Sequence, residues 1–236
     1  MSAEAPRVLM AGESALTVEF GETIDPTLNA RVGALDAALA AADLAGVVEA
    51  VPTYRSLTVH YDPEVISFAG LSRRLLALAA HPGEAPAARR WRVPACYDPP
   101  FDEDTAEVAQ ALGLTRGQVA ALHAGARYRV YMYGFAPGYL FLGGLPAALD
   151  ISRRPTPRPP VPPGALLIAG GQALIASVSM PTGWRMIGRT PSVLFDPARE
   201  PMAQARIGDE IVFEPVDAAR FAELSARRAG LSPAGG

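Results

Sequence analysis

Tyr-Arg-Val-Tyr-Met-Tyr-Gly-Phe-Ala-Pro-Gly-Tyr-Leu-Phe-Leu-Gly-Gly-Leu-Pro, residues 128–146, is an alternating strand that runs into a loop rich in glycine and aromatic residues. An ordinary connection needs one or two turn residues. This loop has such residues at five positions, Gly134, Pro137, Gly138, Gly143 and Gly144. The pattern has two interpretations: a backbone shaped around a ligand, with the rings as pocket walls, or a bulky loop that caps a barrel.

The three rings of this stretch, Phe135, Tyr139 and Phe141, cannot all turn inward from so short a loop. We therefore expect at least one ring to stay partly exposed and to anchor a partner or a ligand. Tyr139 is the ring that we assign to this role. Further along the chain, Trp184 is a second candidate for the pocket wall, although most tryptophans are core residues.

The chain outside this stretch predicts two domains in an α+β class. Residues 1–80 contain two helical patterns and short alternating strands, which favours a ferredoxin-like α+β sandwich. Residues 81–90 are rich in proline and alanine and have no periodicity, so they are predicted to be a linker. Residues 91–236 are mostly short strands separated by turn residues, with a final helix, which favours a barrel or a sandwich.

Composition limits the chemistry that this chain can perform. All 21 basic residues are arginine, which excludes a lysine Schiff base and the Gly-Lys-Ser/Thr of a P-loop. A net charge of −3 favours neither nucleic acid nor an anionic membrane. The single cysteine and three scattered histidines predict no disulfide and no metal site. Without a signal peptide or a long apolar run, we expect a cytoplasmic protein.

Arginines on rigid or motif-like segments are the candidate anion ligands. The segment 153–164 holds six prolines in twelve residues, which predicts a stiff extended crossing rather than a strand. It carries Arg158, whose guanidinium fork would clamp a carboxylate or phosphate at low entropic cost. Arg189 and Thr190 follow a glycine and form a second candidate. The alternative for the proline-rich segment is a surface spacer.

Two further polar residues are candidates for the catalytic site. His123 precedes the strand that leads into the glycine-rich loop, and it either caps helix carbonyls or moves protons near neutral pH. Gln172 follows Gly170-Gly171 in a tight turn and either offers its amide to a ligand or faces water. No nucleophile–histidine–carboxylate arrangement stands out.

Taken together, these motifs resemble the allophanate hydrolase subunit 1 family, which includes the 5-oxoprolinase subunit PxpB and the kinase inhibitor KipI. The resemblance covers nearly the whole chain. The matching pieces are Gly12–Ala15, Glu19–Gly21, Val51–Leu57, Gly134–Tyr139, Leu142–Leu145, Pro157-Arg158, Val161–Gly164, Ile168–Gln172, Gly183-Trp184 and Gly188–Pro191.

The resemblance implies a ferredoxin-like N-terminal domain followed by a cyclophilin-like β-barrel domain. It implies two partners, a homologous barrel subunit (PxpC) and a third subunit (PxpA). Together such subunits open 5-oxoproline to glutamate at the expense of ATP, and the ATP site is not assignable to this chain. Related domains form the carboxyltransferase part of urea carboxylase, and KipI binds a sensor histidine kinase. These three roles are the alternative functions that the resemblance leaves open.

The chain departs from the family pattern around the predicted site. Where the family favours serine, threonine, glycine or tyrosine, this chain has other residues at Ala165, Ala173, Leu174, Ala176 and Met180. A site built to bond a polar substrate loses about 1–3 kcal/mol for each missing partner. The departures imply either a different substrate or a member without catalysis. We expect the chain alone to be inactive.

Overall fold

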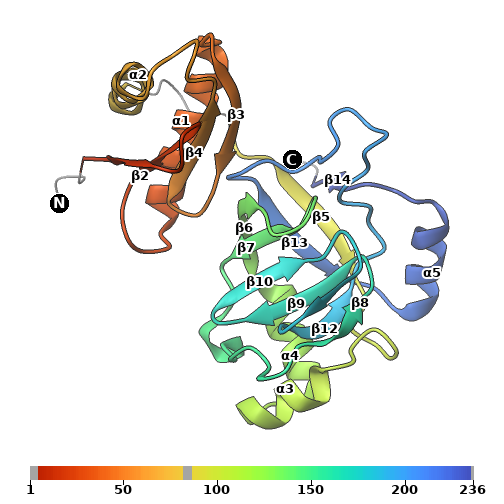
Figure 1. Cartoon of the computed structure of the whole chain (residues 1–236). Helices are drawn as coiled ribbons and strands as arrows, with labels where there is room; N and C mark the ends of the chain where they lie inside the picture. Colours follow the sequence, from red (N-terminus) through yellow and green to blue (C-terminus); the bar gives the residue numbers. More distant parts are fainter. Residues whose placement is uncertain (1–4, 82–86, 235–236) are drawn as a thin grey trace. The chain divides into compact units, whose positions relative to one another are not determined.

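The computed structural model describes residues 5–81 and 87–234. The chain divides into two compact units, Met1–Ala87 and Ala88–Gly236, which are described separately below (Figure 1). Of the predicted linker 81–90, residues 82–86 lie outside the described residues. At its end, Arg90 is already the first residue of a strand of the second unit.

The N-terminal unit is a four-stranded antiparallel sheet with two helices. Its elements are β1 (Arg7–Met10), β2 (Ala15–Glu19), α1 (Pro26–Ala42), β3 (Val47–Pro52), β4 (Ser56–Tyr61) and α2 (Phe68–Ala80). The strand order is β1-β2-β4-β3. Leu57, Val59 and Tyr61 alternate along β4 toward the core, where Leu35 of α1 and Leu71 of α2 are fully buried. Two helices therefore cover one face of this sheet.

The helix α1 begins where its sequence signals predict. The carboxylate of Asp25 accepts hydrogen bonds from the backbone N–H groups of Thr27 and Leu28, at 2.7 and 3.1 Å. Pro26 is the first helical residue, a position at which the missing N–H has no cost.

The α+β prediction is confirmed, with one difference in the ferredoxin-like order of strands. In the βαββαβ arrangement the final strand follows the second helix. Here the strand at the edge beside β2 is β1, which precedes it in a hairpin that pairs Arg7 with Glu19 and Met10 with Leu16. The hairpin supplies at the start of the domain the edge strand that the usual order supplies at its end.

The second unit is a barrel whose sheet has the order β12-β9-β10-β7-β6-β13-β5-β14. Helices α3 and α4 pack together at one end of it (Figure 1). Its strands and helices are β5 (Arg90–Ala95), α3 (Thr105–Leu112), α4 (Arg116–Gly125), β6 (Arg127–Tyr133), β7 (Leu140–Gly143), a 3-10 turn (Ala147–Leu149), β8 (Arg158–Val161), β9 (Ala165–Ala169), β10 (Gln172–Ile175), β11 (Met180–Thr182), β12 (Arg185–Arg189), β13 (Glu210–Pro215), α5 (Ala218–Ala226) and β14 (Ser232–Pro233).

A single backbone bridge closes this barrel. Cys96, just beyond β5, and Arg189, at the end of β12, exchange two N–H···O bonds of 2.8 and 2.9 Å. The strand β12 at one edge of the sheet is thereby joined to β5 near the other edge. The bridge fixes the backbone of Arg189 at this closure, next to the start of the loop that follows β12.

The strand β9 is buried on both faces, which explains its unbroken apolar sequence Ala-Leu-Leu-Ile-Ala. Leu166 and Ile168 face the barrel interior, whereas Leu167 belongs to a second apolar cluster outside the barrel wall. The proline-rich segment covers this outer cluster, and its Val161 is fully buried there. The segment therefore shields from water an apolar face that the barrel would otherwise expose.

The proline-rich segment is not free of strand structure, and the prediction of a non-strand crossing was wrong for its second half. Arg158–Val161 forms β8, which pairs with β11 in a separate two-stranded sheet. The paired residues are Val161 with Met180 and Arg158 with Thr182, with an irregularity between them. Pro159 and Pro160, which cannot donate, lie in that irregular stretch.

The expectation that the chain carries no membrane span can be compared with its helices. Over residues 5–81 and 87–234, no helix is both long enough and apolar enough to cross a membrane.

Candidate functional site

The loop between β6 and β7, residues 134–139, is called here the glycine-aromatic loop. Its backbone turns back on itself through bonds from Gly134 N to Tyr139 O and from Tyr139 N to Ala136 O, at 3.3 and 3.1 Å. Gly138 has φ +72°, and a Cβ there would lie 2.2 Å from Cβ of Phe195. Only glycine fits this turn.

The three rings of this region have different environments. Phe135 is 75% exposed and has φ 67°, a left-handed conformation that is strained for a bulky residue. Tyr139 is 1% exposed, and its hydroxyl donates to the carbonyl of Val178 at 3.0 Å. Phe141 is half-buried, edge-on to Trp184 at 5.9 Å between ring centroids. One ring is exposed as expected, but the choice of Tyr139 was wrong, because Tyr139 is part of the outer apolar cluster.

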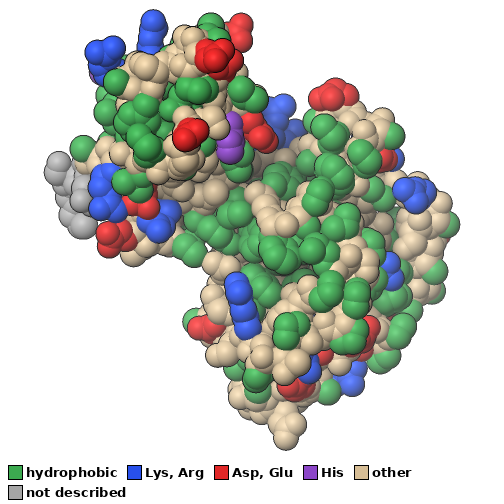
Figure 2. Space-filling model, viewed as in Figure 1, with side chains coloured by type: hydrophobic (Ala, Val, Ile, Leu, Met, Phe, Trp, Pro, Cys, Tyr) green, Lys and Arg blue, Asp and Glu red, His purple; other side chains and the backbone are tan. Residues whose placement is uncertain are grey.

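A cavity of about 440 Å³, called here the aromatic cavity, lies beside this loop. The guanidinium carbon of Arg153 lies 5.6 Å from the ring centroid of Trp184 on its wall. The hydrophobic side chains over β7, β9 and β10 form a broad apolar surface on this side of the barrel (Figure 2). The lining residues are Phe135, Tyr139, Phe141, Arg153, Arg154, Pro155, Pro157, Leu174, Pro181, Thr182, Gly183 and Trp184.

Arg158 is not available to a ligand, and its assignment to an anion site is corrected. Its guanidinium donates to the carboxylate of Asp104 at 2.7 Å and also pairs with Glu103. The side chain is 12% exposed. These carboxylates raise the pKa of Arg158 against the opposing effect of its burial. The positive charge is neutralised inside the protein, where it ties the proline-rich segment to the start of α3.

Asp104 is the centre of this buried network. Its carboxylate also accepts from Arg154 at 3.0 Å and from the backbone N–H of Met186 at 2.7 Å. Glu107 pairs with both Arg154 and Arg185. The arginines of the proline-rich segment and of β12 thus meet a matching set of carboxylates from α3 and the residues before it.

His123 lies in the barrel core, and the proposed role in proton transfer is withdrawn. It is 1% exposed, and its Nδ1 is 2.8 Å from the hydroxyl of Tyr97. Its ring centroid lies 4.6 Å from that of Phe213 and 5.2 Å from that of Tyr128. Burial lowers the pKa of His123 to about 3, so the imidazole is neutral near pH 7.

Gln172 begins β10 directly after the turn at Gly170-Gly171, and it lines neither the aromatic cavity nor the polar cavity described next. Of the positions that depart from the family pattern, Leu174 lines the aromatic cavity and Ala176 lines the polar one. Ala165 and Ala173 are fully buried, and Met180 is half-buried. Two departures therefore place apolar atoms on cavity walls.

A second cavity of about 330 Å³, called here the arginine–hydroxyl cavity, surrounds Arg189 and Thr190. Among the described residues that line it, none carries a carboxylate. These residues are Pro163, Gly164, Ala176, Ser177, Arg189, Thr190, Pro191, Ser192, Val193, Leu194, Phe195, Phe221, Ser225 and Arg228. A carboxylate ligand entering here would meet two guanidinium groups and four hydroxyls.

Arg189 is the strongest feature of this cavity. Its Nε donates to the carbonyl of Pro163 at 2.9 Å, and its guanidinium lies 5.5 and 5.9 Å from the ring centroids of Phe221 and Phe101. Partial burial lowers the pKa of the guanidinium. No ion pair to Arg189 is formed within the described part of the chain. A half-buried cation held by rings and one carbonyl keeps its remaining donors for an anion.

Thr190 is placed by backbone bonds rather than by its hydroxyl. Its N–H donates to Gly164 O at 2.8 Å, and its Oγ1 accepts from the N–H of Ser192 at 3.1 Å. Ser225 and Arg228, from α5 and the residues after it, complete the wall. Sequence reasoning missed both, because arginines at the end of a helix are usually explained as favourable charges for the helix dipole.

The glycine-aromatic loop connects the two cavities. Phe135 and Tyr139 line the aromatic cavity, whereas the carbonyl of Pro137 accepts from the hydroxyl of Ser177, a residue of the arginine–hydroxyl cavity. Gly138 packs against Phe195 of that same cavity. A shift of this loop would therefore alter both sites. Gly134, Pro137 and Gly138 shape the loop and line neither cavity.

The remaining nucleophile candidate is inert. Cys96 is fully buried, and burial raises the pKa of its thiol. Within the described residues, no group of three or more histidine, cysteine or acidic side chains is gathered as a metal site would require. The site is thus a binding arrangement: an anion cavity and an apolar cavity joined by one loop.

Known proteins share this fold and sequence. A family described as carboxyltransferase domain, subdomain C and D, matches residues 6–205. The chain is 36% identical over 214 residues to a 5-oxoprolinase subunit of Bacillus subtilis (strain 168), covering 86% of this chain and 89% of that protein. It is 34% identical over 210 residues to the 5-oxoprolinase subunit of the same name from Escherichia coli O157:H7, covering 89% and 95%.

A solved structure, that of TTHA0988, superimposes on 86% of this chain with a TM-score of 0.77 and 38% sequence identity. The match covers 40% of the TTHA0988 chain, so this chain spans about two fifths of that protein's length. The fold described here therefore also occurs joined to a longer polypeptide.

Proposed function

Since the chain belongs to the family of carboxyltransferase domains, subdomain C and D, we propose that it is a subunit of a 5-oxoprolinase-type complex. The names of the Bacillus subtilis and Escherichia coli relatives, both 5-oxoprolinase subunits of PxpB type, support this assignment. The complex would open the lactam of 5-oxoproline to glutamate at the expense of ATP. Its other members would be a homologous barrel subunit of PxpC type and a subunit of PxpA type.

The observation that carries a role in substrate binding is the half-buried Arg189 without a carboxylate partner in the described chain. The substrate, 5-oxoproline, carries one carboxylate, and a guanidinium fork matches such a group with two parallel N–H···O bonds. Arg228 and the hydroxyls of Ser192 and Ser225 lie in the same cavity. We infer that this cavity orients the carboxylate, while the groups that attack the lactam come from the partner subunits.

The partner surface is proposed to include the aromatic cavity. Phe135 stands at its rim, 75% exposed and held in a strained conformation. Backbone strain of this kind gathers at binding sites, where the surrounding structure enforces it. The longer TTHA0988 chain supports the idea that this fold functions beside a further polypeptide segment.

The test is reconstitution with the partner subunits. The purified chain with ATP and 5-oxoproline is expected to release no glutamate, and the assembled complex to release it steadily. Arg189→Lys in the complex is expected to raise KM about tenfold, because a point charge cannot replace a bidentate fork. The matched control is Arg199→Lys, which changes an exposed arginine paired with Asp196. Steady release by the single chain, or an unchanged KM in Arg189→Lys, would overturn the proposal.

The family description favours a carboxyltransferase-type subunit as the second candidate. Such a subunit would accept carboxyl groups from a biotin carrier and pass them to a urea-like substrate. The two candidates separate in one assay: the assembled complex either consumes 5-oxoproline or transfers labelled bicarbonate in a biotin-dependent manner.

A further inference from the structure

A second basic site lies on the outer face of the barrel sheet, away from the residues of the proposed function. Strands β5, β13 and β6 are neighbours here, and their side chains alternate. Trp91, Ile211 and Tyr128 point into the barrel core. The residues between them therefore point outward, and several of these are arginines.

The register places two of these arginines on either side of one apolar residue. Val212 of β13 pairs with Arg92 of β5 and with Arg127 of β6. Two residues earlier on β13, Glu210 pairs with Arg90, and its carboxylate accepts from Nε of Arg90 at 2.8 Å. An exposed sheet face usually pairs opposite charges across strands. Arg92 and Arg127 depart from this pattern, because each faces Val212.

Arg92 and Arg127 are exposed, and within residues 5–81 and 87–234 neither side chain has a hydrogen-bond or ion-pair partner. They line a cavity of about 400 Å³ together with Arg90 and Glu214. Its wall on the side of β14 is fixed by a bond of 2.8 Å from Ala234 N to Arg90 O.

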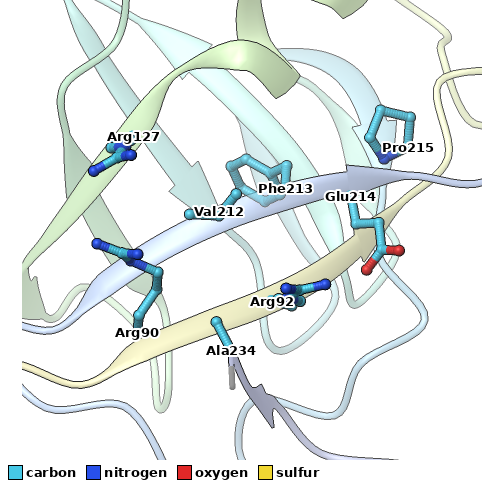
Figure 3. Close-up of a pocket in the computed structure, with 8 residues that line it drawn as sticks. All are labelled: Arg90, Arg92, Arg127, Val212, Phe213, Glu214, Pro215 and Ala234. Carbon is cyan, nitrogen blue, oxygen red and sulfur yellow. The ribbon is translucent and has the colours of Figure 1, made fainter. Parts of the chain in front are cut away.

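The side chains divide the cavity into two ends. Arg90 and Arg127 end on one side of Val212, and Arg92 ends on the other side near Glu214 (Figure 3). The first end holds two guanidinium groups against one carboxylate, Glu210, which Arg90 already pairs. The second end offers both a cation and a carboxylate. The chain as a whole is acidic, with net charge −3, so this basic end is a local concentration of charge.

We propose that this cavity binds a small molecule that bears a phosphate group, with the phosphate between Arg90 and Arg127. Two guanidinium groups that face one space match a dianion, whereas a carboxylate supplies one negative charge. The rest of the ligand lies over Val212 and presents a polar group to Arg92 and Glu214. A volume of this size suits a small ligand. The proposal does not depend on the proposed function.

The experiment is titration of the full-length chain with inorganic phosphate, ATP and acetate by calorimetry at constant ionic strength. Phosphate and ATP are expected to bind and acetate is not. Tighter binding of ATP than of phosphate would assign the site to a phosphate ester, and equal binding to the free anion. Arg127→Gln and Arg90→Gln are each expected to weaken binding about tenfold, since each removes charged hydrogen bonds.

The matched control is Arg74→Gln, which removes an exposed arginine of α2 in the other unit. It is expected to bind phosphate like the wild type, and so is Arg189→Lys. Arg127 has no partner in the described structure, so its variant should unfold at the wild-type temperature. Failure of both phosphate and ATP to bind, or binding that Arg127→Gln leaves unchanged, would overturn the inference.

Discussion

The arginines of the proline-rich segment and the arginine of the arginine–hydroxyl cavity have different neighbours, although their sequence contexts look alike. Arg158 donates to Asp104 at 2.7 Å and also pairs with Glu103. Arg189 has one carbonyl and two aromatic rings around it. The first positive charge is neutralised within the protein and holds elements together. The second is left for a ligand.

This difference follows from the cost of burying charge. A buried ion is stable only when other groups compensate it, and removing one partner leaves the other without compensation. Asp104 has three donors and lies almost wholly out of water. Arg189 avoids the same cost by staying partly exposed at a cavity wall. The buried network should therefore control stability, and the cavity should control binding.

The largest expected effect is at Asp104. Asp104→Ala is expected to destabilise the protein by about 3–5 kcal/mol, because Arg154 and Arg158 lose a shared carboxylate and Met186 N–H loses its acceptor. Urea unfolding measures the change. Glu103→Ala is the control, since Glu103 pairs with the same Arg158 but is 48% exposed, and about 1 kcal/mol or less is expected. Equal losses in the two variants would contradict the distinction.

A smaller effect is expected when the fork geometry alone is changed. Arg158→Lys keeps the charge but loses the two-pronged contact to Glu103 and Asp104, which should cost about 1–3 kcal/mol. Arg189→Lys removes no ion pair within the described chain and should cost under about 0.5 kcal/mol. Both values come from urea unfolding at neutral pH. If Arg189→Lys proves the more destabilising of the two, the two regions have been assigned the wrong roles.

Sequence alone was sufficient for most of the fold because local patterns specify its elements. The caps at Asp25 and Thr115 and the alternation in β4 are signals that nearby residues determine. Arg158 was misassigned for the opposite reason. Its partners Glu103 and Asp104 lie more than fifty positions earlier in the chain, so their proximity is a property of the closed barrel.

The same reasoning explains the errors at single residues. His123 and Tyr139 carry polar atoms, and whether these face water or the core depends on segments distant in the sequence. In the structure, Tyr97 and Val178 satisfy them. Arg189 and Thr190 lie together on one cavity wall, as adjacent residues in a motif can. The residues from α5 and beyond reach that cavity only through the position of the helix, which no local pattern reveals.

His123 sharpens the comparison, because it is a buried base with no carboxylate partner and so stays neutral. Its pKa is about 3 in the folded state, below its ordinary value of 6.5, so the unfolded chain binds the extra proton between these pH values. Stability is therefore present above pH 6.5 and is lost as the pH falls toward 3, by up to about 1.4 kcal/mol per pH unit.

The prediction is tested with His123→Phe by urea unfolding at several pH values. The variant should lose stability less steeply than the wild type on acidification, by about 1.4 kcal/mol per pH unit near pH 5. His60→Gln, which removes an exposed histidine of β4, serves as the control and should follow the wild type. Parallel curves for His123→Phe and the wild type would show that His123 does not resist protonation.

The smallest effect on stability is expected at Phe135, at the rim of the aromatic cavity. Phe135→Gly relieves a positive φ and removes a ring that is 75% exposed, so the free energy of unfolding should change by about 1 kcal/mol or less. Tyr139→Ala removes a buried ring of the same loop and should cost about 3–5 kcal/mol. Co-purification with the homologous barrel subunit should be weakened by Phe135→Gly. Undiminished association, with stability also unchanged, would mean that the exposed ring is not a partner anchor and that the strain at Phe135 serves only the loop.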